Sequence, residues 1–327
     1  MSNDVSSSSP PPSEGQPGFV GRSIRDWTTL RKPAPQWQSI PLGLVCLACC
    51  LAAWYFATLV PGEERFISPV MLPSPEETAD SFKSLWFERA LTINTGITLR
   101  RVFLGFLLAV SVGIPLGVLA GCFSRAQALL APLILFGRNI PLAALIPLTF
   151  FFFGIGETQK VMFIFIACLA FIIADVAVAI RDVGTRYVDT AYTLGASRWQ
   201  IIIKVLVPLA LPSVFNSLRL LFGLAFGYIM LAELVKTGDG AGGLGYLINL
   251  SQRRGPREHI YLIVLIIPVI ALIVDRFLYW IQRELFPHRY GGFGLLNHLV
   301  RLTLHAWDDF KQLFRNKPAV EQTEGAE

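Results

Sequence analysis

Four charged side chains stand out because they lie within long apolar segments, where an ionised group is costly and therefore often functional. They are Arg138, Asp175, Arg219 and Glu233. An arginine in such a segment can supply the counter-charge for an anion in transit, or it can pair internally or extend to the membrane interface. We consider Arg138, the adjacent Asn139, Arg219 and Glu233 as candidates for a translocation pathway. Structural pairing is the alternative for each, and it is favoured for Asp175 and Glu233.

A polar segment between two apolar ones has the spacing of a rigid helix–turn–helix corner. A helix can run to Leu194 and end at Gly195, because glycine accepts the left-handed backbone that a helix end often requires. Ser197 and Gln200 have the spacing of a capping box, which would begin a second helix. Gly195 and Ala196 are small, so the backbone of another protein can approach them closely. The segment therefore predicts a projecting corner that a partner can contact.

We expect no catalytic residue and no metal site in this chain. The sequence lacks the Gly-x4-Gly-Lys-Ser/Thr loop that holds nucleotide phosphates, so no nucleotide-hydrolysing site is expected in it. Gly238, Gly240 and Gly243 match a dinucleotide-binding pattern, but they follow an apolar segment rather than a strand, which indicates an external turn. No nucleophile–base set is apparent. The histidines, none of which has metal-ligand spacing, are His259, His288, His298 and His305.

The elements that position these residues are membrane-spanning helices. Hydrophobic residues make up 53% of the 327 residues and charged ones only 16%, whereas a soluble domain carries about a quarter charged residues. Ile40–Val60 and Val102–Ser124 contain no charge at all. Uncharged runs of this length can cross about 30 Å of hydrocarbon as helices. The net charge of +5 comes from basic residues beside the spans and requires no nucleic acid.

Six spans fit the apolar segments best, so the predicted fold is an all-α, polytopic bundle of six transmembrane helices. A membrane barrel would show short alternating segments instead. Arg138, Pro141 and Pro147 interrupt the third span, which can instead begin at Asn139 and leave Ala126–Gly137 at the interface. The predicted spans are 40–60, 101–122, one within 131–153, 161–180, 212–235 and 260–281.

The distribution of lysine and arginine predicts the orientation of the spans. Four basic residues precede the first span, which indicates a cytoplasmic N-terminus, and the acidic loop after this span suits the outside. With six spans, the 181–207 segment and the C-terminus are then cytoplasmic. The segment 236–259 is external, although it carries Arg253, Arg254 and Arg257 against the rule. The four residues before the first span are Arg22, Arg25, Arg31 and Lys32.

We divide the chain into three regions. Residues 1–39 form a cytoplasmic N-terminal tail, in which Phe19–Trp37 is compatible with a short amphipathic helix. Residues 40–286 form the transmembrane domain, and its cytoplasmic loop covers about 185–207. Residues 287–327 form a cytoplasmic tail whose apolar residues recur at helical spacing between Leu296 and Phe314. This last segment either lies on the membrane surface or packs on a partner.

Two further patterns concern the packing of the spans. Gly113, Gly117 and Gly121 share one side of the second span, and small residues at this spacing allow close helix contact in lipid. They indicate either packing within one subunit or a moving interface. Pro208 and Pro212 are expected to redirect the chain into the fifth span. The five cysteines fall within apolar runs and are expected to be buried hydrophobic residues rather than disulfides.

The cytoplasmic segment resembles the EAA loop of bacterial ABC importer permeases, whose pattern is Glu-Ala-Ala, three residues, Gly, and an apolar stretch that ends in Leu-Pro. Asp189, Thr190 and Ala191 match the first triplet, Gly195 the glycine and Leu211–Pro212 the closing pair. Aspartate in place of glutamate and threonine in place of alanine are the two departures. The resemblance implies a coupling helix that docks into a groove of an ATPase subunit through Asp189, Thr190, Ala191, Gly195, Ala196, Ser197 and Arg198.

The resemblance extends over roughly Leu72–Phe286 and is closest to the nitrate, sulfonate, taurine and bicarbonate branch of these permeases. Several ordered blocks at fitting distances carry it. These blocks are Leu72–Pro75, Arg101–Phe106, Gly113–Gly117, Arg138–Pro141, Phe153–Glu157 and Gly242–Gly245.

This resemblance implies a type I ABC importer fold in the bacterial inner (plasma) membrane. It implies a second permease subunit, expected to be an identical copy, and two ATPase subunits that bind ATP and Mg. A periplasmic or lipid-anchored solute-binding protein would deliver a small oxyanion or organosulfonate such as nitrate, taurine, an alkanesulfonate or bicarbonate. The alternatives are a secondary transporter or channel that is not coupled to ATP, or a membrane-embedded enzyme. A secondary transporter would be expected to show proton-relay carboxylates or inverted repeats, and no clear repeat is present.

Overall fold

The computed structural model describes residues 36–59, 71–235, 242–254 and 256–290. The chain divides into two units, Met1–Ser74 and Pro75–Glu327, which are described separately below. The expected C-terminal amphipathic helix lies outside the described residues, as does most of the segment expected to form a helix before the first span.

The first unit contains the helix α2, which covers Gln36–Ala57. Most of its apolar side chains that the structure describes are exposed within this unit, as expected of a helix that lipid or another helix surrounds. The Trp54 indole donates a hydrogen bond of 3.0 Å to the carbonyl of Pro73, which ties the end of the helix to the segment that follows. This helix confirms the first predicted span, although Cys46, Cys49 and Cys50 are exposed within the unit rather than buried.

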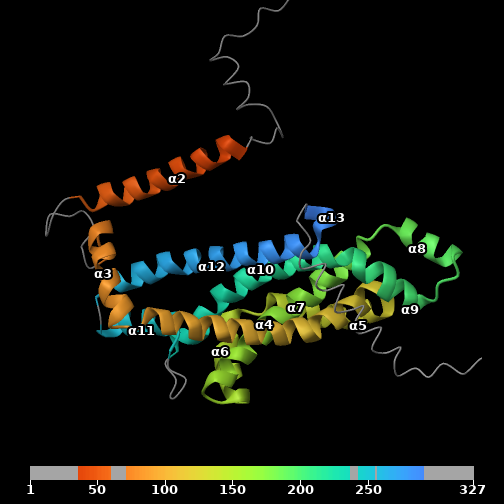
Figure 1. Cartoon of the computed structure of the whole chain (residues 1–327). Helices are drawn as coiled ribbons and strands as arrows, with labels where there is room; N and C mark the ends of the chain where they lie inside the picture. Colours follow the sequence, from red (N-terminus) through yellow and green to blue (C-terminus); the bar gives the residue numbers. More distant parts are fainter. Residues whose placement is uncertain (1–35, 60–70, 236–241, 255, 291–327) are drawn as a thin grey trace, which may run out of the picture. The chain divides into compact units, whose positions relative to one another are not determined.

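The second unit is an all-helical bundle, and none of its described residues is in a strand. This confirms the predicted fold class. The elements, shown in Figure 1, are α3 Pro75–Phe87, α4 Leu91–Cys122, α5 Ser124–Asn139, α6 Leu142–Phe153, α7 Glu157–Arg181, α8 Thr185–Thr193, α9 Arg198–Ile201, a π-helical turn Ile202–Leu206, α10 Val207–Leu234, α11 Leu244–Arg254, α12 Glu258–Leu285 and α13 Pro287–Tyr290.

Among the described residues, five helices are long and apolar enough to cross a membrane, and the bent pair α5–α6 brings the total to six if it counts as one span. The two helices of the pair meet at 107°. The break lies at Ile140–Pro141, where proline has no N–H to continue the helical ladder. The third span is therefore interrupted where Arg138 and Pro141 predicted an irregularity.

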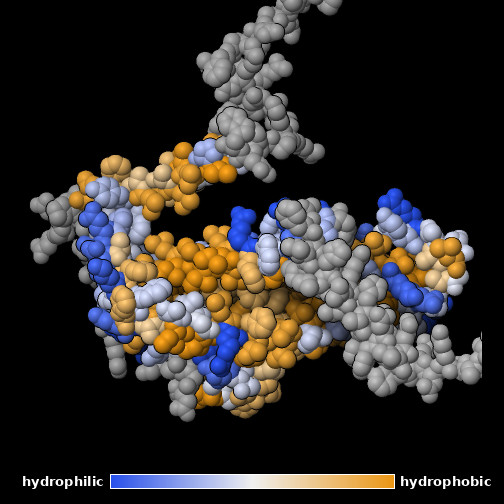
Figure 2. Space-filling view, in the orientation of Figure 1, coloured by the Kyte–Doolittle hydropathy of each residue, from blue (hydrophilic) through white to orange (hydrophobic). Residues whose placement is uncertain are grey.

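The long helices run between two ends of the bundle, which Figure 1 separates clearly. One end carries α8 and α9 and is called the α8–α9 end. The other carries α3 and α11 and is called the α11 end. Figure 2 shows a hydrophobic surface over α12 between the two ends, with hydrophilic residues over α3 and over α8. This distribution suits a bundle whose middle is surrounded by lipid and whose ends meet water.

Helix α7 is the centre of the unit, because most of its apolar residues are buried. It packs closely against α4 through the glycines of that helix. A Cβ atom at Gly113 would lie 2.7 Å from Cγ2 of Ile172, and one at Gly121 would lie 2.6 Å from Cβ of Ile180. Gly117 faces α7 in the same way. The predicted glycine stripe therefore packs within the subunit, as small residues do between helices in lipid.

The prediction that Pro208 and Pro212 redirect the chain was wrong. Arg198–Leu234 is a single apolar helical segment that passes from α9 through the π-helical turn into α10. Pro208 lies just after the π turn, where the hydrogen-bond pattern changes from that of a π-helix to that of an α-helix. Pro212 is tolerated within α10, and the wider π turn supplies the change in register between the two helices.

Candidate coupling corner and membrane-embedded charges

The corner between α8 and α9 is fixed by bonds within its own backbone. Gly195 has a φ of 78°, the left-handed conformation that glycine accepts without a Cβ clash. Its N–H donates to the carbonyl of Tyr192 at 2.9 Å, and the N–H of Ala196 donates to the carbonyl of Ala191 at 3.0 Å. This pair of bonds is the Schellman arrangement that ends a helix. The predicted helix end at Gly195 is confirmed.

The second arm of the corner begins with the predicted capping box. The backbone N–H of Gln200 donates to Oγ of Ser197 at 3.4 Å, and the N–H of Ser197 donates to Oε1 of Gln200 at 2.8 Å. These bonds satisfy two amide groups that the first turn of α9 leaves without helical partners. The corner is therefore held on both sides of Ala196.

The residues predicted to contact an ATPase lie together on this corner, and most of them are exposed. Ala191 is buried and Ala196 is half-buried. Sequence reasoning missed the apolar surface beside them, because Leu194 is 82% exposed and Trp199 is 62% exposed. Large apolar side chains in an otherwise polar loop are the signal that could have indicated it. The exposed predicted residues are Asp189, Thr190, Gly195, Ser197 and Arg198.

Arg138 and Asn139 are exposed at the end of α5, directly before the break in the third span. The Arg138 guanidinium lies 5.1 Å from the ring centroid of Phe171 on α7. The Asn139 amide donates to the carbonyl of Leu135 at 2.7 Å. These two predicted pathway residues therefore lie where the backbone is irregular.

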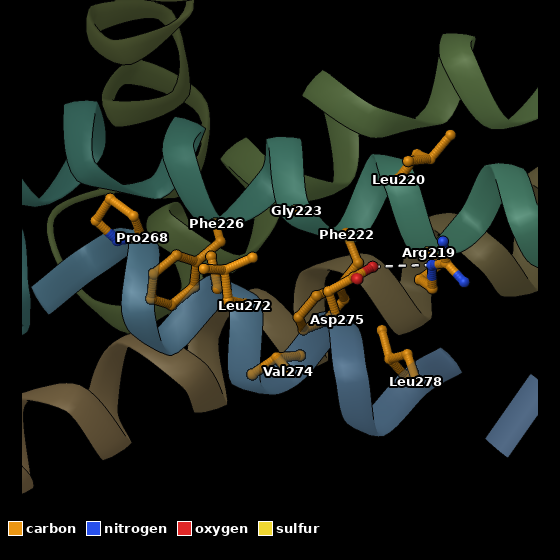
Figure 3. Close-up of a pocket in the computed structure, with 11 residues that line it drawn as sticks. Arg219, Leu220, Phe222, Gly223, Phe226, Pro268, Leu272, Val274, Asp275 and Leu278 are labelled. Atoms are coloured by element: carbon orange, nitrogen blue, oxygen red, sulfur yellow. Dashed lines mark ion pairs between the residues drawn. The ribbon is translucent and has the colours of Figure 1, made fainter. Parts of the chain in front are cut away.

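Arg219 of α10 lies against α12 and is engaged by several side chains there, as Figure 3 shows for Asp275. Its Nε lies 2.8 Å from Oδ1 of Asp275, and one terminal nitrogen donates to Oε1 of Gln282 at 2.9 Å. The guanidinium also stacks 5.0 Å from the ring centroid of Tyr279. Arg219 lines two mostly apolar cavities, of about 320 and 530 Å³, beside α12. The geometry is that of an internal pair.

Glu233 lies at the α11 end of α10, and its side chain is fully buried. Its carboxylate accepts hydrogen bonds from Thr98 at 2.9 Å, from Arg101 at 2.8 Å and from the backbone N–H of Gly245 at 3.0 Å. Burying a carboxylate is costly unless it is paired and hydrogen-bonded, and here it is both. The contacts of Glu233 are therefore those of a structural ion pair.

Arg101 is the partner that sequence reasoning missed. It is only 1% exposed, and besides Glu233 it pairs with Glu157 at the start of α7. Arg100 lies 3.7 Å from the same Glu157 carboxylate. Lys160, one turn along α7, is also buried. The adjacent arginines at 100–101, next to a long apolar run, could have indicated a buried ion pair. The same pattern is equally typical of arginines that anchor a span at the membrane interface.

Known proteins resemble this chain over most of its length. Residues 113–287 match the family described as the binding-protein-dependent transport system inner membrane component. A putative ABC transporter permease of Methanocaldococcus jannaschii is 34% identical over 68% of this chain and 84% of its own length. The taurine transport system permease of Escherichia coli is 29% identical over 77% of this chain and 91% of its own. The nitrate import permease of Synechococcus elongatus is 30% identical over 75% and 89%.

The fold has a counterpart among solved structures. The bundle resembles the MetNI methionine ABC transporter in inward-facing conformations, with a TM-score of 0.55 and 23% identity over 62% of this chain and 98% of the other. At this identity the likeness concerns the fold alone. Taken with the family match and the multi-pass apolar helices, it leads to one assignment: this chain belongs to the binding-protein-dependent transport system inner membrane components and is a membrane-spanning permease subunit of an ABC importer.

Proposed function

We propose that two identical copies of this chain form the pathway of an importer for a small oxyanion or organosulfonate. Relatives named as taurine and nitrate permeases support this class of substrate. A solute-binding protein delivers the substrate from outside, and it contributes much of the selectivity. Two separate ATPase subunits bind ATP and Mg, so this chain catalyses no reaction itself.

The proposal assigns the α8–α9 corner to the contact with the ATPase. The observation that carries it is the exposure of Leu194 and Trp199 on a corner that its own backbone bonds hold rigid. Exposed apolar residues beside small and polar ones suit a groove on a partner. A rigid corner can transmit a displacement to the helices on either side, because its shape need not change when it is pulled. The α8–α9 end, and both chain termini, are then cytoplasmic.

The proposal assigns Arg138 and Asn139 to the pathway between the two copies. Lipid cannot satisfy the polar backbone at an irregular break, so broken helices at membrane depth face protein or a water-filled cavity. The exposure of Arg138 and Asn139 at the 107° break supports such a location. The arginine would offer counter-charge to an anion that passes. The bonded partners of Arg219 and Glu233 favour structural pairing for these two residues.

Co-purification of this chain with an ATPase subunit from native membranes tests the coupling assignment. Gly195→Asp places a Cβ and a charge at a left-handed position on the corner, and we expect it to abolish the complex and ATP-driven uptake. Gly184→Asp is the matched control, because Gly184 lies at the other end of α8 with a φ of −57°, and a Cβ there would come no closer than 3.8 Å to a neighbouring atom, an ordinary contact.

The result that would overturn the assignment is an intact complex and intact uptake in Gly195→Asp. Substrate-driven uptake by the chain alone, without an ATPase, would instead support the alternative of a secondary transporter or channel.

A further inference from the structure

The α11 end contains a network of buried charged side chains that has no role in the proposed pathway. We propose that Arg101 is a positioning residue that makes two ion pairs, one that persists and one that opens during transport. The pair with Glu233 is called the permanent arm, and the pair with Glu157 is called the releasable arm. Through Glu233 it holds the start of α11 in place throughout the transport cycle. Through Glu157 it holds the turn between α6 and α7 and releases that turn when the pathway opens. Only the last step, release during transport, rests on the proposed function.

The permanent arm begins with a carboxylate that water does not reach. The Glu233 side chain is 0% exposed and the Arg101 side chain 1%. Arg101 bonds Glu233 at 2.8 Å, and the Thr98 hydroxyl adds a bond of 2.9 Å to the same carboxylate. Breaking one partner of a buried pair leaves the other charge uncompensated, which is strongly unfavourable. This arm therefore stays closed in any folded state.

The same residues cap the N-terminus of α11. The first N–H groups of a helix have no partner within it. Here Gly243 donates to Asn94 at 2.8 Å, Leu244 donates to Thr98 at 2.9 Å and Gly245 donates to Glu233. A negative charge at this position also suits the positive end of the helix dipole.

Arg101 completes the attachment of α11, because it donates to the carbonyl of Gly242 at 2.7 Å. A Cβ at Gly245 would lie 2.7 Å from Cβ of Glu233, so glycine is needed for this approach. The start of α11 is thus fixed to both α4 and α10.

The releasable arm differs in its contact with water. The Glu157 side chain is 39% exposed, although Arg101 donates to both of its oxygens. Arg100, which is 67% exposed, lies 3.7 Å away and can hold the carboxylate in a second position. Release returns the Glu157 carboxylate to water, and the buried Arg101 keeps Glu233 as its counter-charge. Opening this arm is therefore far less costly than opening the arm to Glu233.

The turn before Glu157 contains two glycines with backbone conformations that other residues rarely adopt. Gly154 has a φ of 70° and Gly156 a φ of 151°, and a Cβ at either would meet no atom within 4 Å. These glycines are required by backbone conformation rather than by close packing. A hydrogen bond of 2.8 Å from the Gln159 amide to the Thr149 hydroxyl joins the helices on either side of this turn and keeps α6 on α7. The residues after Thr149 are the ones that can move when Glu157 is released.

Hydrogen exchange measured by mass spectrometry on the full chain in lipid nanodiscs tests the two arms separately. We expect Glu157→Gln to accelerate exchange about tenfold in residues 150–157 and to leave residues 243–247 unchanged. We expect Glu233→Gln to accelerate residues 243–247 by at least as much. Glu76→Gln, at an exposed carboxylate of α3, serves as the control for loss of charge.

A neutral variant keeps the test valid if Glu233→Gln does not fold. Thr98→Val removes one hydroxyl from the start of α11 and keeps every charge, so it should accelerate residues 243–247 alone. Ser111→Ala is its control, because the Ser111 hydroxyl bonds only within α4, to the carbonyl of Leu108. The proposal is overturned if Glu157→Gln loosens both segments equally or neither.

Release during transport is tested on the complex with the co-purified ATPase. ATP with vanadate, which traps the ATPase in a closed state, should accelerate residues 150–157 in the native protein and leave 243–247 protected. Protection of both segments, with faster exchange elsewhere in the bundle, would overturn the releasable arm. If no ATPase co-purifies, the proposed function fails, and the measurements on the chain alone still decide the two-arm arrangement.

Discussion

The two ends of the bundle both depend on glycines with positive φ, but they hold their shape by opposite means. The α8–α9 corner uses backbone and capping bonds between residues at most five positions apart, and its surface is exposed. The α11 end uses buried charges, and its bonds join residues up to 149 positions apart. A surface that a partner pulls must be rigid by itself. An end that fastens several helices together needs bonds that cross between them.

The largest effect is expected where a buried charge loses its partner. Arg101→Leu leaves the Glu233 carboxylate buried without its cation, and we expect a loss of about 3–5 kcal/mol in the free energy of unfolding. Denaturant unfolding of the chain in mild detergent, followed by tryptophan fluorescence, measures this loss.

A double variant sharpens this result. Combining Arg101→Leu with Glu233→Leu removes both charges, so the cost should be smaller than the sum of the two single substitutions. Strictly additive costs would show that the two side chains do not act as a pair, and the α11 end would then resemble the α8–α9 end.

At the α8–α9 corner, the largest effect should be on assembly rather than on stability. Leu194 is 82% exposed, so Leu194→Glu should leave the unfolding free energy nearly unchanged. If Leu194 occupies a groove on the ATPase, the substitution should weaken the complex by about 2–4 kcal/mol. Binding of the purified ATPase to the nanodisc-embedded permease gives the affinity.

Thr185→Glu is the matched control, because Thr185 is exposed at the far end of α8. It adds the same charge away from the corner and should leave the affinity unchanged. Equal weakening by both variants would mean that charge, rather than apolar contact at Leu194, governs the complex.

Between the two ends, several glycines of α4 pack closely against apolar side chains of α7. A Cβ at Gly117 would lie 2.6 Å from Cβ of Val176, so Gly117→Ala should cost about 1–3 kcal/mol in unfolding free energy. Gly96→Ala on the same helix adds a methyl group to open space and should cost nothing, because alanine forms helices better than glycine. The difference between the two changes in unfolding free energy, measured in one detergent, separates overpacking from helix propensity. A larger loss at Gly96 would contradict the packing account.

What the sequence could predict follows the same division between local and distant bonds. The spans and the corner rest on patterns within a few residues, such as Ser197 with Gln200, so both were predicted. The partners of Arg101 lie 56 and 132 positions away, and no local pattern connects them. Pro212 was misjudged because a local rule for proline ignores the π turn that precedes it. The assignments of Arg138 and Asn139 to a pathway stay predictions.

The smallest effect should come from the cap of α9. Ser197→Ala removes the hydroxyl that accepts the N–H of Gln200, which typically costs about 1 kcal/mol. Because the corner is held by local bonds, this loss should stay local. Hydrogen exchange should accelerate about fivefold in residues 198–201 and remain unchanged in residues 243–247. Thr193→Ala is the control, because the Thr193 hydroxyl bonds a carbonyl within α8 and caps nothing. Faster exchange that spreads from residues 198–201 through the π turn into α10 would contradict this expectation. It would show that the corner depends on the bundle for its shape. A partner could then not move the corner as a rigid unit.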